Sequence, residues 1–346
     1  MNTPSHFSRG MLYAIAITAL LFFIWEIYWR AQGLPIAYNE DNAAWANYRA
    51  KVDAGTDPKI VLIGSSRMKF DIDLATFEDA AGVAPIQLSL HATSPLPALH
   101  DLANDSLFTG TLLIGVTEGL FFAPPFARPV TEMVKRVNYY HHWTPAQRAS
   151  FGISRTLEAG LVSLDQDQLS LNALLARAPI PLRAGVFSMP VFPIDWSEVD
   201  SRRQSRLSEK LLHDKAMQDQ VRYVWAHLSM LGGRRAPAGD TLTGALIPVK
   251  RSIDKLKARG VQVYFVKAPV DSPFWEGEQK AFPRNLFWDY MLEFTQTQGV
   301  HFDDYPGLKK FRCPEGSHLA PADAVPFTAE LVRILKTEKG WKIPAQ

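Results

Sequence analysis

The sequence predicts an α/β fold built on a five-stranded parallel sheet that is covered by helices on both faces and attached to one N-terminal membrane helix. Short apolar and β-branched runs alternate with helix-like stretches, as in parallel sheets buried on both sides. An uncharged apolar run near the N-terminus is long enough to span a membrane. The interval between the third and fourth runs is too long for one crossover and predicts a large, mainly helical insertion.

The N-terminal run indicates a membrane anchor. No charged residue occurs from Gly10 to Trp25, and an aromatic cluster typical of a membrane interface ends the run at Trp29. At 1.5 Å per residue, residues 10–29 would form a helix about 30 Å long, which matches the hydrocarbon core of a bilayer. The alternative is a cleaved signal peptide, but the nearest Ala-x-Ala sequence, at residues 44–46, lies too far downstream. We therefore expect an uncleaved anchor over residues 10–29.

The charges that flank the anchor favour one orientation. Arg9 and the α-amino group lie before the run, whereas Arg30 and Lys51 lie after it. We expect residues 1–9 to be cytoplasmic and the body to be outside. In a bacterium this places the chain in the inner (plasma) membrane as a single-pass protein, with its body in the periplasm or extracellular. Residues 30–57 are expected to form a polar, helical stalk.

Composition excludes several classes of protein. The chain has 346 residues, with 37 Lys and Arg against 35 Asp and Glu, so a net charge of +2 gives no support for a nucleic-acid partner. The only cysteine, Cys313, excludes an intrachain disulfide and a thiolate metal cluster.

The predicted strands divide the body into parts. Residues 58–120 form the first part of the sheet domain, residues 121–250 form the insertion or cap, and residues 251–346 form the second part. Residues 321–336 are expected to form a closing helix. The expected strands are Lys59–Ile63, Ile86–Leu90, Thr111–Val116, Val261–Ala268 and Val300–Asp303.

A serine follows the first strand at a position where ligands bind. Gly64, Ser65, Ser66 and Arg67 come directly after the strand, and open parallel sheets bind ligands just beyond the carboxyl ends of their strands. A hydroxyl at this position could be a nucleophile. The alternative is a purely conformational role, because small residues commonly follow strands.

An acid and a histidine lie near the other end of the chain. Glu315 and His318 stand at i and i+3, between the last strand and the closing helix. A serine needs a base to become a nucleophile, and the imidazole needs an acid that holds its tautomer. The pair can supply both, although a Glu-x-x-His sequence is also common as a surface cap or a solvated pair.

Taken together, these segments resemble the SGNH or GDSL hydrolase superfamily. The resemblance covers residues 59–335 apart from the insertion. It implies a three-layer, flavodoxin-like α/β fold in which Ser66, rather than Ser65, is the nucleophile, because residues 64–66 stand where the family has Gly-Asp-Ser. Glu315 and His318 stand where the family has Asp and His.

The two middle motifs of the family depart from its pattern. The glycine that lines the family's oxyanion hole corresponds here to Ala92, and the asparagine corresponds to Thr117. We expect the N–H groups of Ser66 and Ala92 to stabilise the oxyanion, with the Thr117 hydroxyl assisting. Because loss of one oxyanion donor costs about 10²–10³ in rate, a specialised enzyme is favoured over a fast general esterase.

The departures and the anchor together resemble a membrane-anchored subgroup of this superfamily. The subgroup includes the D-alanyl transfer protein and the polysaccharide O-acetylation factors. This resemblance implies a membrane-bound O-acyltransferase as partner and a cell-envelope polysaccharide as acceptor. The function expected is transfer of an acyl group, with acetyl favoured, through an acyl-Ser66 intermediate. It requires no metal and no organic cofactor.

Two other functions remain open. A periplasmic carbohydrate esterase or deacetylase would use the same triad and accept water. A non-catalytic scaffold of an envelope polysaccharide machine would show Ser66 and His318 beyond hydrogen-bond reach, or a cleft plugged by the insertion.

Several other residues could have either a functional or a structural role. Arg67 could bind a substrate carboxylate or form a salt bridge at the sheet edge, and His91 could contact substrate. Residues 139–143 (YYHHW) could form a metal or sugar site, but a packed element of the insertion is favoured. The basic residues at 202–206 are expected on a solvated helix face.

Overall fold

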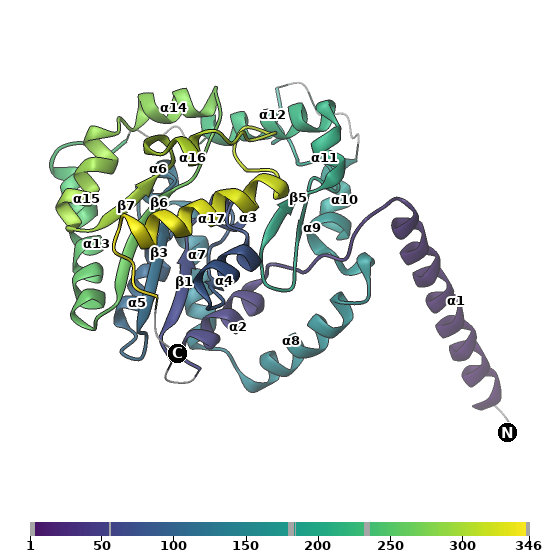
Figure 1. Ribbon diagram of the computed structural model, residues 1–346. Helices are drawn as coiled ribbons and strands as arrows, with labels where there is room; N and C mark the ends of the chain where they lie inside the picture. Colours follow the sequence, from purple (N-terminus) through teal and green to yellow (C-terminus); the bar gives the residue numbers. More distant parts are fainter. Residues whose placement is uncertain (1–3, 55–56, 179–182, 184, 232–235, 344–346) are drawn as a thin grey trace.

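The computed structural model describes residues 4–54, 57–178, 183, 185–231 and 236–343. Its central sheet has five parallel strands in the order β2-β1-β3-β6-β7, which confirms the predicted parallel sheet (Figure 1). This is the strand order of doubly wound, flavodoxin-like sheets. The strands are β1 (Lys59–Ile63), β2 (Ile86–Gln87), β3 (Gly110–Gly115), β6 (Gln262–Lys267) and β7 (Gln298–His301).

The second strand is shorter than expected, but its backbone pairing continues. β2 ends at Gln87, whereas the sequence predicts a strand to Leu90. The backbone N–H groups of Leu88 and Leu90 still donate to the carbonyls of Leu62 and Gly64. The segment therefore stays beside β1 as far as the edge of the sheet where Ser66 lies.

Helices cover both faces of the sheet, as predicted. Alternate residues of β1 point to opposite faces: Val61 and Ile63 belong to one buried core, and Ile60 and Leu62 to the other. The first core is covered chiefly by α2 (Asn42–Val52), α5 (Leu96–Asn104), α13 (Asp240–Ala258) and α15 (Tyr290–Thr295). The second is covered by α4 (Leu74–Ala81), α16 (Pro306–Lys309) and α17 (Pro321–Thr337), of which α17 is the predicted closing helix.

The insertion is mainly helical, but it also contains a two-stranded antiparallel hairpin. Its predicted end at residue 250 lies inside α13, whose Leu242, Leu246 and Val249 pack into the sheet core. The start of α13 therefore belongs to the sheet domain. The elements of the insertion are α7 (Arg128–His141), α8 (Pro145–Glu158), η1 (Val162–Leu164), α9 (Gln166–Leu169), α10 (Leu171–Arg177), β4 (Ser197–Val199), β5 (Ser205–Leu207), α11 (Glu209–His213) and α12 (Lys215–Leu231).

The segment predicted as a stalk belongs to the body. It is helical as expected over α2, but Trp45, Tyr48 and Val52 are buried in the first core. The polar composition of this segment suggested an exposed stalk, but its Arg49 is buried and forms ion pairs with Asp53, Asp101 and Asp105. These ion pairs allow a charged residue to lie in a packed layer.

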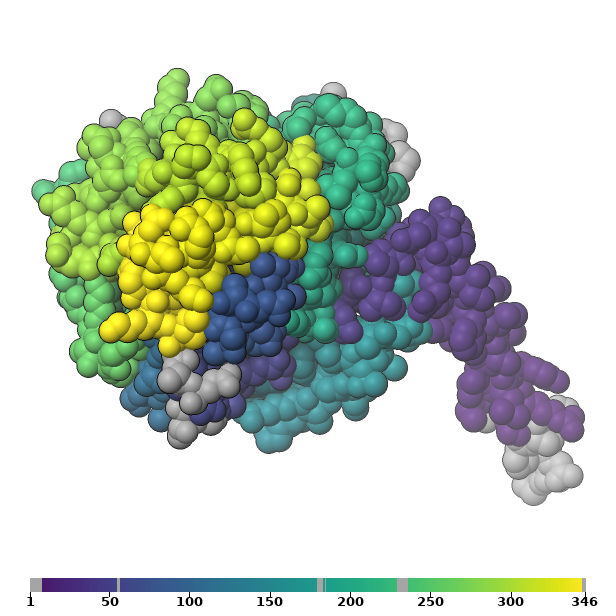
Figure 2. All heavy atoms as spheres, viewed as in Figure 1, coloured from purple at the N-terminus to yellow at the C-terminus, as the bar shows by residue number. Residues whose placement is uncertain are grey.

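The N-terminal helix α1 (Pro4–Ala31) is long and apolar enough to span a membrane. The candidate span covers Ser8–Ala31, has a mean hydropathy of 2.0 and is almost entirely exposed in the isolated chain. Figure 2 shows this helix projecting from the body. The remaining short elements are α3 (Ser66–Phe70), α6 (Glu118–Phe121), α14 (Phe274–Ala281), a π-helix η2 (Asn285–Asp289) and η3 (Phe302–Asp304).

Candidate active site at the carboxyl edge of the sheet

Ser66 lies at the carboxyl end of β1, as its position in the sequence predicts. It is half-buried and is the first residue of α3, and Ser65 is the N-cap of that helix. Position 64 requires glycine because Met68 and the backbone of Gly115 lie too close to it to leave room for a side chain. A Cβ there would lie 2.4 Å from Cγ of Met68 and 3.2 Å from the backbone of Gly115. The end of β1 therefore packs directly against the end of β3.

Glu315 and His318 form an oriented, fully buried pair. Both residues are 0% exposed. Oε1 of Glu315 lies 2.7 Å from the backbone N and 2.7 Å from Nδ1 of His318. Nδ1–H donates to the carboxylate in this arrangement, and Nε2 is the ring nitrogen left to act on a substrate or a hydroxyl. Nε2 has no hydrogen-bond partner among the described residues.

The fold brings this pair to the helix that begins at Ser66. The ring of Phe70 packs against the ring of His318, with a centroid separation of 4.3 Å. Phe70 lies one turn after Ser66, and side chains at i and i+4 share a face of a helix. Ser66 and His318 therefore lie in the same part of the structure, although Ser66 is not hydrogen-bonded to Nε2.

Aromatic residues of the insertion cover the pair. The rings of Trp225 from α12 and Trp196 beside β4 lie 5.5 and 6.4 Å from the His318 ring. Nε1 of Trp225 donates to Oε2 of Glu315, so the insertion also occupies the second carboxylate oxygen. Phe192 stacks on Trp196 with a centroid separation of 4.7 Å. We call Phe192, Trp196 and Trp225 the aromatic cover.

Ala92 has the backbone conformation that a glycine would adopt. Its φ is +53°, in the left-handed region, and the residue is exposed. Alanine at position 92 is therefore compatible with the left-handed backbone that glycine favours.

The hydroxyl of Thr117 is already bonded. Its Oγ1 lies 2.8 Å from Oγ of Ser65, and Ser65 is buried. In this structure Thr117 joins the end of β3 to the end of β1.

We expect the Ser65 and Thr117 hydroxyls to stabilise the fold as a pair. Thr117→Val leaves the buried hydroxyl of Ser65 without a partner and should lower the free energy of unfolding by about 1–3 kcal/mol. Ser65→Ala leaves the half-buried hydroxyl of Thr117 without one and should cost less. The double variant should lose less than the sum, because it leaves no orphan group. Chemical denaturation of the four proteins measures this coupling. Additive losses would contradict it.

Arg67 lies in a buried ionic network. Its guanidinium lies 2.5 and 3.1 Å from the two carboxylate oxygens of Glu278 on α14. Lys267, at the end of β6, lies 2.6 Å from the same carboxylate and also donates to Glu118, which follows β3. Of the two roles considered for Arg67, the structure shows the salt bridge. The charges of Arg67 and Lys267 outweigh burial and lower the pKa of Glu278 to about 2.

His91 lies close to the candidate site. Its ring stacks on the ring of Phe70, which also packs against His318, and the His91 and Phe70 centroids are 5.4 Å apart. Nε2 of His91 lies 2.8 Å from Oγ of Ser205. Burial and the nearby Lys69 charge hold the pKa of His91 well below its usual value. His91 is therefore neutral at physiological pH and can offer a hydrogen bond without a charge.

Two supports of the site were not predicted. Asp71, directly after α3, is fully buried, and its Oδ1 accepts from the N–H of Leu319, the residue after His318. Burial raises the pKa of Asp71 well above its usual value. No local pattern marks this residue, because the contact joins positions far apart in the chain.

The second support is a buried ion triad beneath the site. Glu40 contacts Lys69 of α3 at 2.6 Å and Arg203 of the β4–β5 hairpin at 2.6 Å. Arg203 also donates to the carbonyls of Gln87 and Ser89, at the end of β2. The triad therefore holds together the segment after α1, the helix of Ser66 and the loop that leads to Ala92.

The other basic and aromatic motifs have structural roles. Arg203, expected on a solvated helix, is fully buried in the hairpin. Trp143 packs with Ala43 and Ala46 of α2, as the packing interpretation of residues 139–143 predicts. No group of residues that could hold a metal ion occurs in the described part of the chain.

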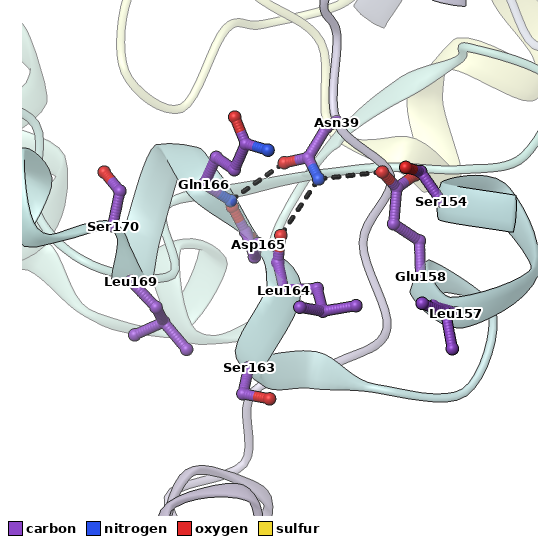
Figure 3. A pocket seen from close by; sticks show the side chains of 10 residues that line it. All are labelled: Asn39, Ser154, Leu157, Glu158, Ser163, Leu164, Asp165, Gln166, Leu169 and Ser170. Carbon is purple, nitrogen blue, oxygen red and sulfur yellow. Dashed lines mark hydrogen bonds between the residues drawn. The ribbon is translucent and has the colours of Figure 1, made fainter. Parts of the chain in front are cut away.

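A pocket of about 250 Å³ lies elsewhere, between α8 and α9 (Figure 3). Asn39 joins its two sides: its amide nitrogen donates to Glu158 and to the Leu164 carbonyl, and its oxygen accepts from the Gln166 N–H. None of the three candidate catalytic residues lines this pocket.

Comparison with protein-family models and with curated protein sequences found no match to this chain.

Proposed function

We propose that this protein is a membrane-anchored serine acyltransferase of the SGNH type. The observation that carries the proposal is the buried Glu315–His318 pair, whose free Nε2 is packed against the helix that begins at Ser66. An acid, a base and a hydroxyl in this relation are the components of a nucleophilic serine site. The parallel sheet with Ser66 at its carboxyl edge supports the same function.

The proposed reaction is a double displacement. Oγ of Ser66 attacks the carbonyl carbon of an acyl ester or thioester, and Nε2 of His318 accepts the hydroxyl proton. Collapse of the tetrahedral intermediate breaks the bond to the leaving group, which takes that proton and leaves acyl-Ser66. A sugar hydroxyl then attacks the acyl carbon, gives its proton to Nε2 and departs as the ester. The proton returns to Ser66.

Two features favour a sugar hydroxyl over water as acceptor. Nε2 of His318 is buried, and the aromatic cover lies over it. Water has poor access to the base in this arrangement, whereas a bound acceptor that displaces part of the cover would place its hydroxyl there. An envelope polysaccharide is the acceptor that suits a body tethered beside a membrane.

A non-catalytic scaffold is the second candidate. The absence of a hydrogen bond between Ser66 and His318 favours it, and so does the burial of His318 beneath residues of the insertion. In that function the aromatic cover would be a permanent plug.

Covalent labelling of the full-length protein with a fluorophosphonate probe tests the catalytic proposal. Wild type should be labelled, and Ser66→Ala and His318→Ala should lose the label. Ser65→Ala is the matched control and should keep it. A folded wild-type protein that takes no label would contradict the acyltransferase and favour the scaffold. A second experiment separates transfer from hydrolysis. Acetyl-enzyme is formed from p-nitrophenyl acetate and mixed with a glucan oligosaccharide. Acetylated sugar as product supports the transferase, whereas free acetate alone supports an esterase.

A further inference from the structure

Hydrogen bonds join the end of α1 to the body. Glu26, the single charge in the apolar run, accepts from the backbone N–H groups of Val162 and Ser163 at 3.0 and 2.9 Å. Arg30 contacts Glu26 at 2.7 Å and donates to the carbonyl of Gly160 at 2.6 Å. Three hydrogen bonds therefore hold residues 160–163 at the level where α1 enters the body, and the ion pair between Arg30 and Glu26 lies within α1 itself.

The helix that leads into this junction exposes apolar residues. α8 ends at Glu158, two residues before Gly160. Glu158 of this helix is buried, whereas Ile153 is 64% exposed and Leu157 is 48% exposed. Residues at i and i+4 form a continuous stripe along a helix. Figure 1 shows α8 as the lowest helix of the body, on the side toward which α1 extends.

A second helix extends this surface. In α10, Leu171 and Leu175 are 70% and 52% exposed, again at i and i+4. The pocket in Figure 3 lies between α8 and the start of α10, because Leu157 lines one side and Ser170, the N-cap of α10, lines the other. We call Ile153, Leu157, Leu171 and Leu175 the juxtamembrane face.

The two helices of this face expose few charges. The only acid of α8, Glu158, is buried and bonded to Arg155 and Asn39, and α10 contains no acid. Arg148, on α8, is exposed. Arg148 is nine residues from Leu157 and so lies on the other side of α8, and the exposed Asp167 lies on α9, between the two helices in the chain. An apolar stripe that itself carries no charge is typical of helices that lie in a membrane interface.

We infer that the juxtamembrane face lies in the lipid interface of the bilayer that α1 spans. The contacts of Glu26 and Arg30 leave α8 little freedom to move away from the membrane. The body is then held against the bilayer at two places, by the anchor and by this face, so its orientation is set. The inference rests on α1 spanning the membrane, and it is independent of the reaction at Ser66.

Site-directed spin labelling of the full-length protein in vesicles of phosphatidylcholine and phosphatidylglycerol tests the inference. A nitroxide is attached at Ile153→Cys or Leu171→Cys and compared with Arg251→Cys, an exposed control on α13. Ala16→Cys reports insertion of α1. The native Cys313 is buried, and labelled wild type measures its background.

Labels at 153 and 171 should be several-fold more accessible to oxygen relative to a water-soluble nickel chelate than the label at 251. Equal ratios at 153, 171 and 251, with a high ratio at 16, would overturn the inference. A low ratio at 16 would overturn its premise that α1 is inserted. Protection from both reagents in native membranes would assign the face to a protein partner instead of lipid, which also overturns it.

Discussion

Replacing Glu315 by glutamine is expected to slow covalent labelling of Ser66 by about 10³–10⁴-fold, as loss of the triad acid does in serine hydrolases. Oε1 accepts from two donors of His318, and Oε2 accepts from Nε1 of Trp225. A glutamine must place its NH₂ at one of these positions. Facing Nδ1, it moves the imidazole proton to Nε2, which can then no longer act as a base. If the NH₂ group faces Trp225 instead, it and the Nε1–H of Trp225 are two donors pointed at each other, with no acceptor between them.

The rate of fluorophosphonate labelling measures this effect, with thermal unfolding as a check that the variant is folded. Glu293→Gln is the matched control, because Glu293 is exposed on α15 and should leave the rate unchanged. A Glu315→Gln protein that is labelled at the wild-type rate would show that Glu315 only stabilises the turn, and the proposed triad would be wrong.

Replacing Glu40 by alanine is expected to lower the free energy of unfolding by about 3–5 kcal/mol, because two buried cations lose their shared counter-charge. The side chains of Lys69 and Arg203 are both 0% exposed, so neither can turn to solvent. The denaturant midpoint of the full-length protein measures the loss, and Glu293→Ala is the exposed control. A loss no larger than that of the control would show that the triad does not hold the fold together.

The acid dependence of stability gives a second measurement of the same triad. Burial alone would raise the pKa of Glu40, but the charges of Arg203 and Lys69 outweigh it and lower this pKa from 4.5 to about 2. A lowered carboxyl pKa contributes stability that is complete above pH 4.5 and is lost as the pH falls toward 2. The wild-type midpoint should therefore fall across this window, and the Glu40→Ala midpoint should fall less.

Loss of the Glu40 triad is also expected to disturb the candidate site. Lys69 lies on the helix of Ser66, and Arg203 holds the carbonyls at the end of β2. Loss of Glu40 is expected to slow fluorophosphonate labelling as well as destabilise the fold, whereas Ser65→Ala should affect chiefly stability. The two effects can be separated by labelling well below the unfolding temperature.

The sequence alone predicted those parts of the protein that depend on local pattern. The apolar runs gave the strands of the sheet, because a strand buried on both faces must be apolar at nearly every position. The α17 helix was predictable from Pro321 onward, because an acid, Asp323, lies in its first turn and a base, Lys336, in its last. The pairing of Glu315 with His318 was also predictable, because residues three apart in a turn can reach each other.

Long-range packing decided the rest. Trp196 and Trp225 cover His318, and Glu278 binds Arg67, through contacts between residues that are far apart in the chain. The same is true of the charges that allow Arg49 and Arg203 to be buried. A charged residue in a sequence is expected at the surface, and only the tertiary structure brings together the partners that make its burial possible.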